Sequence, residues 1–351
     1  MITASIKLAT RWSGHSRFGW LTTLVITFIG AVLRFANLAN PKVLVFDETY
    51  YVKDAYTLGL FGSERKWPEN ANAAFEAGDI SGFLDSAAYV VHPPFGKWVI
   101  WLGMQPFGAE SPFGWRFATA LLGTLMIPLV IVIARKLIGS NFFAAVAGLL
   151  MALEGLSITL SRTAILDGIL AFFVVLGFYF TILDGEQWRQ RLRSTRSSSL
   201  MIRPWLLAAG LTLGLAISVK WSGLYFLAAF GLYTLVIDIW LRGKFGMPRI
   251  LAIGQGFLNA LTLLLPALIA YLVSWLGWIL GSDGWGRNSE GNWLESLWAY
   301  HLNAFGFHTG LASDHPYQAN AFQWLISLRP TAFFFERYED GENCGLLENC
   351  T

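Results

Sequence analysis

Long apolar segments alternate with shorter polar ones along most of this 351-residue chain. A helix needs about 20 apolar residues to cross roughly 30 Å of hydrocarbon. Segments near that length lie at about 18–36, 113–134, 142–160, 164–183, 204–222, 223–240 and 257–280. The pattern predicts an all-α polytopic membrane protein with about seven transmembrane helices.

Two apolar stretches need a separate interpretation. Trp98–Phe107 is about half the length of a span, so we expect it to lie along the membrane interface. The basic tail before the first segment resembles that of a signal peptide. However, the apolar run is long, Arg34 interrupts its end, and no small-x-small cleavage motif follows. We therefore expect an uncleaved signal-anchor helix.

Composition supports the membrane class and excludes others. Hydrophobic residues make up 55% of the chain, charged residues make up 14%, and the mean hydropathy is +0.50, which does not describe a soluble surface. The basic residues are clustered and form no nucleic-acid-binding stripe, so nucleic acid is not an expected partner. The two cysteines, Cys344 and Cys350, exclude a disulfide scaffold and a cysteine metal cluster, and leave open one local disulfide.

Basic residues predict the orientation of the chain. They cluster in the amino-terminal tail, at Arg135-Lys136, at 189–203 and at 242–249, all on one side of the seven predicted helices. By the positive-inside rule that side, with the N-terminus, is cytoplasmic. We therefore expect a transmembrane core over 1–280, whose first outer loop is 37–112, and an outer-face loop region over 281–351.

Charged residues within or beside the apolar segments gather at the predicted outer ends. They are Arg34, Arg116, Glu154, Arg162, Asp167 and Lys220. A charge at mid-bilayer costs about 2.5–3.5 kcal/mol on insertion scales, so such residues pair, snorkel or face a wet cavity. Snorkelling or a structural ion pair explains any single one. Because all six share one leaflet, we expect a polar cavity there.

An acid pair, Asp47-Glu48, lies in the first outer loop above this cavity. Arginine offers planar donors that suit a phosphate entering sideways from lipid, such as a polyprenyl phosphate. Adjacent helical residues point about 100° apart, so both acids cannot address one atom. We assign Asp47 as general base, and Glu48 to orienting the acceptor or pairing with an arginine. The alternative is a solvated acidic dipeptide or a helix N-cap.

Histidines supply further candidates. His92-Pro93-Pro94 forms a rigid turn that leads into a helix with Lys97, and His92 either contacts substrate or satisfies the turn. His301, His308 and His315 are spaced seven apart, but intervening glycines argue against one unbroken helix and against a metal site. We expect His315 and Tyr317 to make substrate or interface contacts instead.

Several motifs together resemble the protein O-mannosyltransferases of bacterial type. They are Arg34, Val45-Phe46-Asp47-Glu48-Thr49-Tyr50-Tyr51, His92-Pro93-Pro94-Phe95-Gly96-Lys97, Trp115-Arg116-Phe117, Glu154, Ser161-Arg162, Leu166-Asp167, Ser218-Val219-Lys220-Trp221-Ser222-Gly223-Leu224 and His315-Pro316-Tyr317. The resemblance implies the C-type glycosyltransferase membrane fold. It also implies transfer of mannose from polyprenyl-phosphate-mannose to Ser or Thr of proteins, with inversion, at the outer face of the plasma membrane.

The resemblance further implies that no metal or other cofactor is needed, because the lipid-linked sugar is a substrate. Expected partners are secreted or membrane protein acceptors, membrane lipid and the protein translocation machinery. Asp47 would be the base, with Glu48, Arg34 and Arg116 as essential support. Arg162 and Lys220 would contact the donor phosphate, Glu154 and Asp167 would line the cavity, and His92, Lys97, His315 and Tyr317 would contact the acceptor or its loops.

The chain corresponds to about the amino-terminal two thirds of such a protein, so we expect it to end within the outer loop after the seventh helix. Two other functions stay open at this point. One is a related transferase that uses another sugar or a glycolipid acceptor. The other is a lipid-sugar transporter or flippase, which should carry polar residues through the membrane midplane, whereas the charges here stop at one face.

Overall fold

The computed structural model describes residues 17–195, 200–312, 318–324, 326 and 328–334. Within this part of the chain the regular elements are helices, and one antiparallel bridge pairs Arg65 with Ala87. The prediction of an all-α protein is thus confirmed for the described residues. The chain forms two compact units, 1–305 and 306–351. His315, Tyr317, Cys344 and Cys350 lie outside the described residues.

The helices follow the predicted segments closely. They are α2 (Arg17–Phe35), α3 (Glu48–Phe61), α4 (Ala71–Glu76), α5 (Phe95–Phe107), α6 (Pro112–Ile138), α7 (Asn141–Leu153), α8 (Gly155–Ser161), α9 (Leu166–Thr195), α10 (Pro204–Ile217), α11 (Gly223–Lys244), α12 (Leu251–Ser274), α13 (Leu276–Leu280), α14 (Trp293–Gly310) and α15 (Ala321–Trp324). Helix α15 belongs to the second unit.

Among the described helices, α6, α9, α11 and α12 are long and apolar enough to cross a membrane. The bent pair α7 and α8 provides a fifth span if the two helices are counted together, while α2 and α10 are shorter apolar helices. The several apolar helices agree with a multi-pass membrane protein.

Some predicted boundaries are wrong. The segment 142–160 is two helices with a 58° bend at Glu154, because the Glu154 carboxylate accepts the N–H groups of Leu156 and Ser157 and starts a new helix. The segment 257–280 is likewise divided at Trp275, and α10 ends at Ile217, before Lys220. Helix α14 carries His301 and His308 and runs through Gly306, but it ends at Gly310, and His315 lies outside the described residues.

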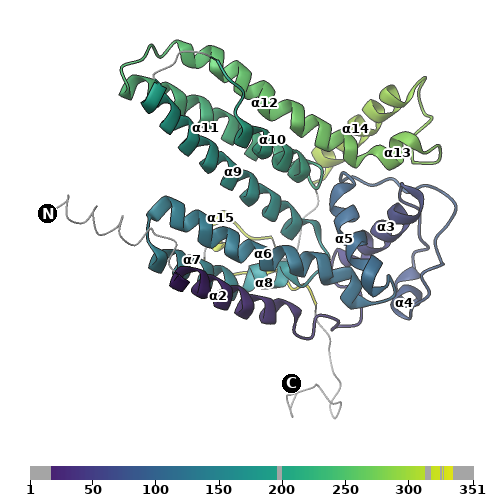
Figure 1. Ribbon diagram of the computed structural model, residues 1–351. Coiled ribbons are helices and arrows are strands. Elements are labelled where there is room, and N and C mark those ends of the chain that lie inside the picture. The colour runs from purple at the N-terminus through teal and green to yellow at the C-terminus, as the bar shows by residue number, and fades with distance from the viewer. Residues whose placement is uncertain (1–16, 196–199, 313–317, 325, 327, 335–351) are drawn as a thin grey trace. The chain divides into compact units, whose positions relative to one another are not determined.

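The helices of the first unit form two groups (Figure 1). Helices α9 to α12 pack against one another, α2, α6, α7 and α8 form the second group, and α6 contacts α9 between the groups. Close approach within the first group requires glycine: a Cβ on Gly214 of α10 would lie 2.5 Å from the Cα of Ala267 in α12. Helix α5 packs against α3, α6 and α9, so it joins the segment 37–112, predicted to be the first outer loop, to both groups.

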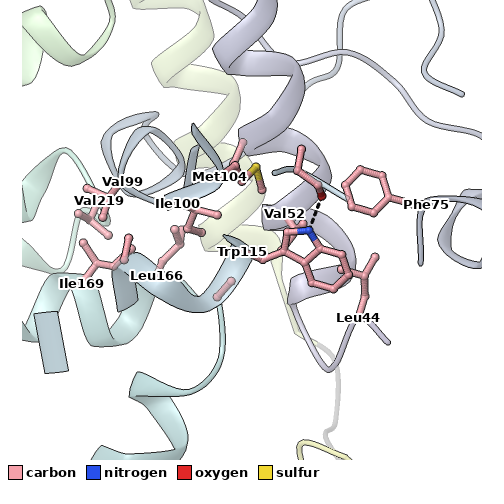
Figure 2. Packing of buried hydrophobic residues seen from close by; sticks show 14 residues of the cluster. Leu44, Val52, Phe75, Val99, Ile100, Met104, Trp115, Leu166, Ile169 and Val219 are labelled. Atoms are coloured by element: carbon pink, nitrogen blue, oxygen red, sulfur yellow. Dashed lines mark hydrogen bonds between the residues drawn. The ribbon is translucent and has the colours of Figure 1, made fainter. Parts of the chain in front are cut away.

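A buried apolar cluster supports the loop that carries the acid pair (Figure 2). Its centre is Trp115 of α6, whose indole N–H donates to the carbonyl of Ala109 at 2.5 Å. Leu44, Val52 and Phe75 from the segment 37–112 surround this indole (Figure 2). Because Trp115 precedes Arg116, the same cluster holds the acid pair and its arginine in a fixed relation.

Candidate active site

Glu48, the first residue of α3, is wholly buried against Arg116 of α6. The Arg116 Nε and Nη2 groups each donate to one carboxylate oxygen at 2.8 Å. The same carboxylate accepts the backbone N–H of Ala164 at 2.7 Å and of Val45 at 3.0 Å. This bidentate, fully bonded pair corresponds to the predicted pairing of Glu48 with a nearby arginine.

Arg116 also holds the turn before the acid pair. Its Nη1 donates to the carbonyls of Leu38 and Pro41, and its Nη2 donates to that of Val43 at 2.9 Å. Nε and both Nη groups, which carry all five N–H donors of the guanidinium, are thus bonded to protein oxygens. A phosphate contact would require one of these bonds to break, so the geometry favours a supporting role for Arg116.

Arg34, at the end of α2, also has all its guanidinium nitrogens hydrogen-bonded to protein oxygens. Its side chain is fully buried and reaches both sides of the bend between α7 and α8. Its acceptors are the carbonyls of Gly30, Met151 and Ala152 and the hydroxyls of Ser157 and Ser161. These five bonds match its five N–H donors, so Arg34 ties α2 to the α7–α8 bend.

Arg162 and Glu154 both satisfy helix ends. Arg162 donates to the carbonyls of Leu33, Arg34, Ala36 and Asn37, at and beyond the end of α2. The last turn of a helix leaves carbonyls unsatisfied and favours a cation there. Glu154 caps α8, as described above. Arg162 was predicted to contact the donor phosphate and Glu154 to line a cavity, and in the structure both stabilise helix ends.

Asp47 differs from its neighbour. It occupies the N-cap position of α3, yet no backbone N–H among the described residues caps its carboxylate. Asp47 thus stands at the N-cap position, but the alternative in which its side chain caps the helix is not supported. Its half-buried carboxylate is hydrogen-bonded to Tyr51, one turn along α3. The preceding Phe46 has φ +51°, a left-handed conformation that is unfavourable for an aromatic residue and marks a strained turn.

Asp167 and Lys220 lie close to Asp47. The Lys220 ammonium donates to both Asp167 carboxylate oxygens at 2.9 Å. Burial raises the pKa of Asp47, while the nearby Lys220 charge lowers it and the Asp167 charge raises it. The side chains of Lys220 and Asp167 are 19% and 46% exposed. We call such a solvent-accessible ion pair open, and a pair whose two side chains are buried closed. The structure thus brings together Asp47, Asp167 and Lys220 from three separate segments.

A second polar group lies further along α3. Burial raises the pKa of Asp54 to about 7, and the positive charge of Lys97 opposes that rise. Lys97 is buried, pairs with Glu64 and donates to the carbonyl of His92 at 3.4 Å. Lys97, which the sequence predicted to contact the acceptor or its loops, therefore forms an internal ion pair with Glu64. The His92 ring lies 6.2 Å from that of Tyr51, which places it beside the site.

Sequence reasoning missed Tyr51, Asp54 and Glu64. Asp47, Tyr51 and Asp54 are spaced i, i+4 and i+7, the spacing of one helical face. That spacing was available as a signal once a helix starting at Glu48 was assumed. Glu64 had no such signal, because its partner Lys97 lies 33 positions away and on another element.

An apolar groove of about 500 Å³ is lined by Trp221, the residue that follows Lys220 in the chain. It lies between α10, α11, α12 and α14, and Trp221, Leu264, Leu268, Trp298 and Leu302 are among its lining residues. Tyr271 and His301 add polar atoms to it. His301, the first of the three histidines spaced seven apart, lies in the first unit and lines this groove. Within the described residues no three His, Cys, Asp or Glu side chains gather as a metal site requires.

Comparison with known proteins places this arrangement in context. Residues 24–278 match the family described as dolichyl-phosphate-mannose-protein mannosyltransferase. The polyprenol-phosphate-mannose–protein mannosyltransferase of Mycobacterium tuberculosis is 33% identical over 93% of this chain and 65% of its own length. That of Corynebacterium glutamicum is 31% identical over 92% of this chain and 66% of its own length. The chain thus spans about two thirds of the curated relatives it matches.

A solved structure supports the fold. The S. cerevisiae protein O-mannosyltransferase Pmt1-Pmt2 complex bound to the sugar donor aligns with a TM-score of 0.60 at 23% identity. The alignment covers 82% of this chain and 38% of that chain. At this level of identity the match concerns the fold, which agrees with the helical arrangement described above.

Proposed function

The chain belongs to the dolichyl-phosphate-mannose-protein mannosyltransferase family, and from this premise we propose that the protein transfers mannose from polyprenyl-phosphate-mannose to Ser or Thr hydroxyls of proteins. The relatives from Mycobacterium tuberculosis and Corynebacterium glutamicum are named for a polyprenol-phosphate-mannose donor and a protein acceptor. We propose that the acceptors are secreted or membrane proteins and that the reaction takes place at the outer face of the plasma membrane. The protein translocation machinery would deliver them.

One observation carries this proposal: Asp47 is half-buried and close to the open Asp167–Lys220 pair, whereas Glu48 is fully bonded to Arg116. In the proposed step the Asp47 carboxylate takes the proton of the acceptor hydroxyl. The hydroxyl oxygen forms a bond to the anomeric carbon while the bond from that carbon to the phosphate oxygen breaks. A single displacement of this kind inverts the anomeric centre, and polyprenyl phosphate leaves with the bonding electrons.

Lys220 provides positive charge for the leaving phosphate. Its ammonium carries three N–H donors, is partly exposed and is held by Asp167. Stabilising charge that develops on a leaving group is among the largest contributions to catalysis. The apolar groove that begins at Trp221, next to Lys220, would take the polyprenyl chain. The groove and the cation together match the two ends of a lipid phosphate.

For the membrane arrangement we propose seven spans, formed by α2, α6, the α7–α8 pair, α9, α10, α11 and α12, in the C-type glycosyltransferase fold. The charge pattern supports it, since Asp167 opens α9 and the arginines at 189–193 close it. The N-terminus would be cytoplasmic, and α3 and α5 would lie at the outer membrane interface in contact with lipid.

The experiment measures transfer of labelled mannose from polyprenyl-phosphate-mannose to a Ser/Thr peptide by the full-length protein in membranes. We expect Asp47→Asn to reduce the rate about 100-fold or more while the protein still binds donor, because general base catalysis contributes about 10²–10⁴-fold. Asp79→Asn is the matched control, since Asp79 is an exposed carboxylate in the same outer loop. Transfer to lipid alone, or an active Asp47→Asn variant, would contradict the proposal.

A further inference from the structure

Lys220 lies in a short break between α10 and α11, at residues 218–222. Contacts to three other helices hold this break. The backbone N–H of Phe95 in α5 donates to the Ser218 carbonyl at 3.0 Å, and Lys220 pairs with Asp167 of α9. The third contact is from Trp221, whose indole N–H donates to the hydroxyl of Tyr271 in α12 at 3.1 Å.

The third contact continues into α14. The Tyr271 hydroxyl oxygen lies 2.6 Å from Nε2 of His301, and Nδ1 of His301 lies 2.6 Å from the Leu297 carbonyl oxygen. A carbonyl only accepts, so Nδ1 must carry a hydrogen. Burial lowers the pKa of His301, which favours the neutral ring, and Nε2 is then an acceptor. Tyr271 therefore donates to His301 and accepts from Trp221.

Ring packing supports this hydrogen-bond chain. The rings of Trp221 and His301 are nearly parallel, at 20°, with centroids 5.8 Å apart. The Trp275 ring lies 5.2 Å from His301 on the same side of α12 as Tyr271. Tyr271, Trp221 and His301 all line the apolar groove, and Trp221 directly follows Lys220 in the chain. These hydrogen bonds thus connect His301 of α14 with Trp221, the neighbour of Lys220.

We propose that Tyr271 and His301 are positioning residues, which orient Lys220 toward the phosphate of a polyprenyl phosphate through Trp221. The inference rests on the proposed function. A lysine side chain is long and flexible, and this one projects from a non-helical break. Fixing Trp221 limits the directions that the neighbouring ammonium can take. Tyr271 and His301 touch neither the phosphate nor the sugar in this arrangement, so their effect on the donor passes through Lys220.

The test uses Tyr271→Phe in the full-length protein reconstituted in lipid nanodiscs, because this change removes the hydroxyl and keeps the ring. The probes are polyprenyl phosphate and the corresponding polyprenol, which has no phosphate. We expect the Kd for polyprenyl phosphate and the KM for the mannosyl donor to rise about three- to tenfold, as for loss of one hydrogen bond. The Kd for polyprenol and the kcat at saturating donor should stay within about twofold.

Two further variants separate positioning from packing. His301→Gln keeps an acceptor for the Tyr271 hydroxyl and should retain near-normal affinity for polyprenyl phosphate, whereas His301→Leu should weaken it as Tyr271→Phe does. Tyr225→Phe is the control, because Tyr225 is 79% exposed on α11.

Unchanged affinity in Tyr271→Phe, or equal weakening of polyprenol and polyprenyl phosphate, would overturn the positioning role. Equal affinities of His301→Gln and His301→Leu for polyprenyl phosphate would overturn it as well. If the wild-type protein binds polyprenyl phosphate but transfers no mannose to peptide, the proposed function fails alone, and the two Kd values still decide the positioning role.

Discussion

Ion pairs lie at both ends of the helix groups, and two pairs at each end illustrate a difference in burial. One end has Glu48–Arg116 and Asp167–Lys220, and the other has Asp184–Arg203 and Asp238–Arg242. Helix α9 carries both Asp167 and Asp184, about 26 Å apart at 1.5 Å per residue. The two regions therefore lie at different levels along the same helix, Asp167 in its first turn and Asp184 in its second half.

At the Asp184 end both pairs are closed. All four side chains are buried, and Asp238 also accepts the indole N–H of Trp188 at 2.8 Å. The Trp188 ring has Arg203 at 4.7 Å and Arg242 at 5.7 Å from its centroid. At the other end Glu48–Arg116 and Lys97–Glu64 are closed, and Asp167–Lys220 is open beside Asp47. We therefore expect a charged residue in the helix groups to take part in the reaction only if its ion pair leaves the charge accessible to substrate.

The largest effect on stability should come from breaking a closed pair. Arg116→Leu would leave the Glu48 carboxylate buried without its partner, and such changes cost about 3–5 kcal/mol. We expect a large fall in the Tm of the purified protein and loss of mannose transfer. Arg203→Leu, at the opposite end, should lower the Tm to a similar degree. A Tm within a few degrees of wild type in either variant would show that the pair is not closed.

Asp184 and Asp167, two acids of α9 that form ion pairs with cations of other segments, should affect stability and kinetics differently. Asp184→Asn should lower the Tm, because Arg203 loses its buried counter-charge, but the kcat per folded molecule should be unchanged. Asp167→Asn should barely change the Tm, since its side chain is 46% exposed, but should alter the KM for donor through Lys220. Thermal unfolding and steady-state kinetics on both variants measure this contrast. Equal kinetic effects of the two changes would remove the distinction between the ends.

The dependence of kcat/KM on pH tests the open pair. Asp47 acts as a base only when deprotonated, so kcat/KM should fall as the pH drops through its pKa, which burial raises. The Lys220 charge lowers that pKa, so Lys220→Gln should move the fall to higher pH. The Asp167 charge raises it, so Asp167→Asn should move the fall to lower pH. Shifts in the opposite directions would show that another group controls the profile.

The smallest effect is expected at Arg162. Arg162→Gln removes the cation at the end of α2, which is worth about 0.3–1 kcal/mol, and the Tm should fall slightly. If Arg162 only caps α2, the Kd for polyprenyl phosphate will not change. A several-fold rise in that Kd would instead support the contact with the donor phosphate that the sequence predicts. Arg249→Gln is a control, because Arg249 is exposed and lies at the other end of the helix groups.

The apolar segments and the gathering of charge could be predicted from the sequence because each depends on residues close together in the chain. A helix that crosses hydrocarbon must be apolar over about 20 residues, and this requirement is visible in the sequence. The acid pair and its motifs were equally local, and with the other motifs they pointed to the correct family. The bend at Glu154 was missed, because a carboxylate that caps a new helix does not interrupt the apolar pattern.

Only the tertiary structure decided which charged side chains have their hydrogen-bonding groups bonded to other protein atoms. Glu48 and Arg116 are 68 positions apart, and Trp221, Tyr271 and His301 span 80 positions, yet each set is in direct contact. An ion pair or hydrogen bond depends on distances of about 3 Å between atoms, which hydropathy and spacing do not specify. The sequence by itself therefore determined the apolar segments and the family, and it predicted that Asp47 and Glu48 stand at a charged membrane face. The contact of Arg116 in α6 with Glu48 at the start of α3 determined that Glu48 is closed in a pair while Asp47 stays accessible.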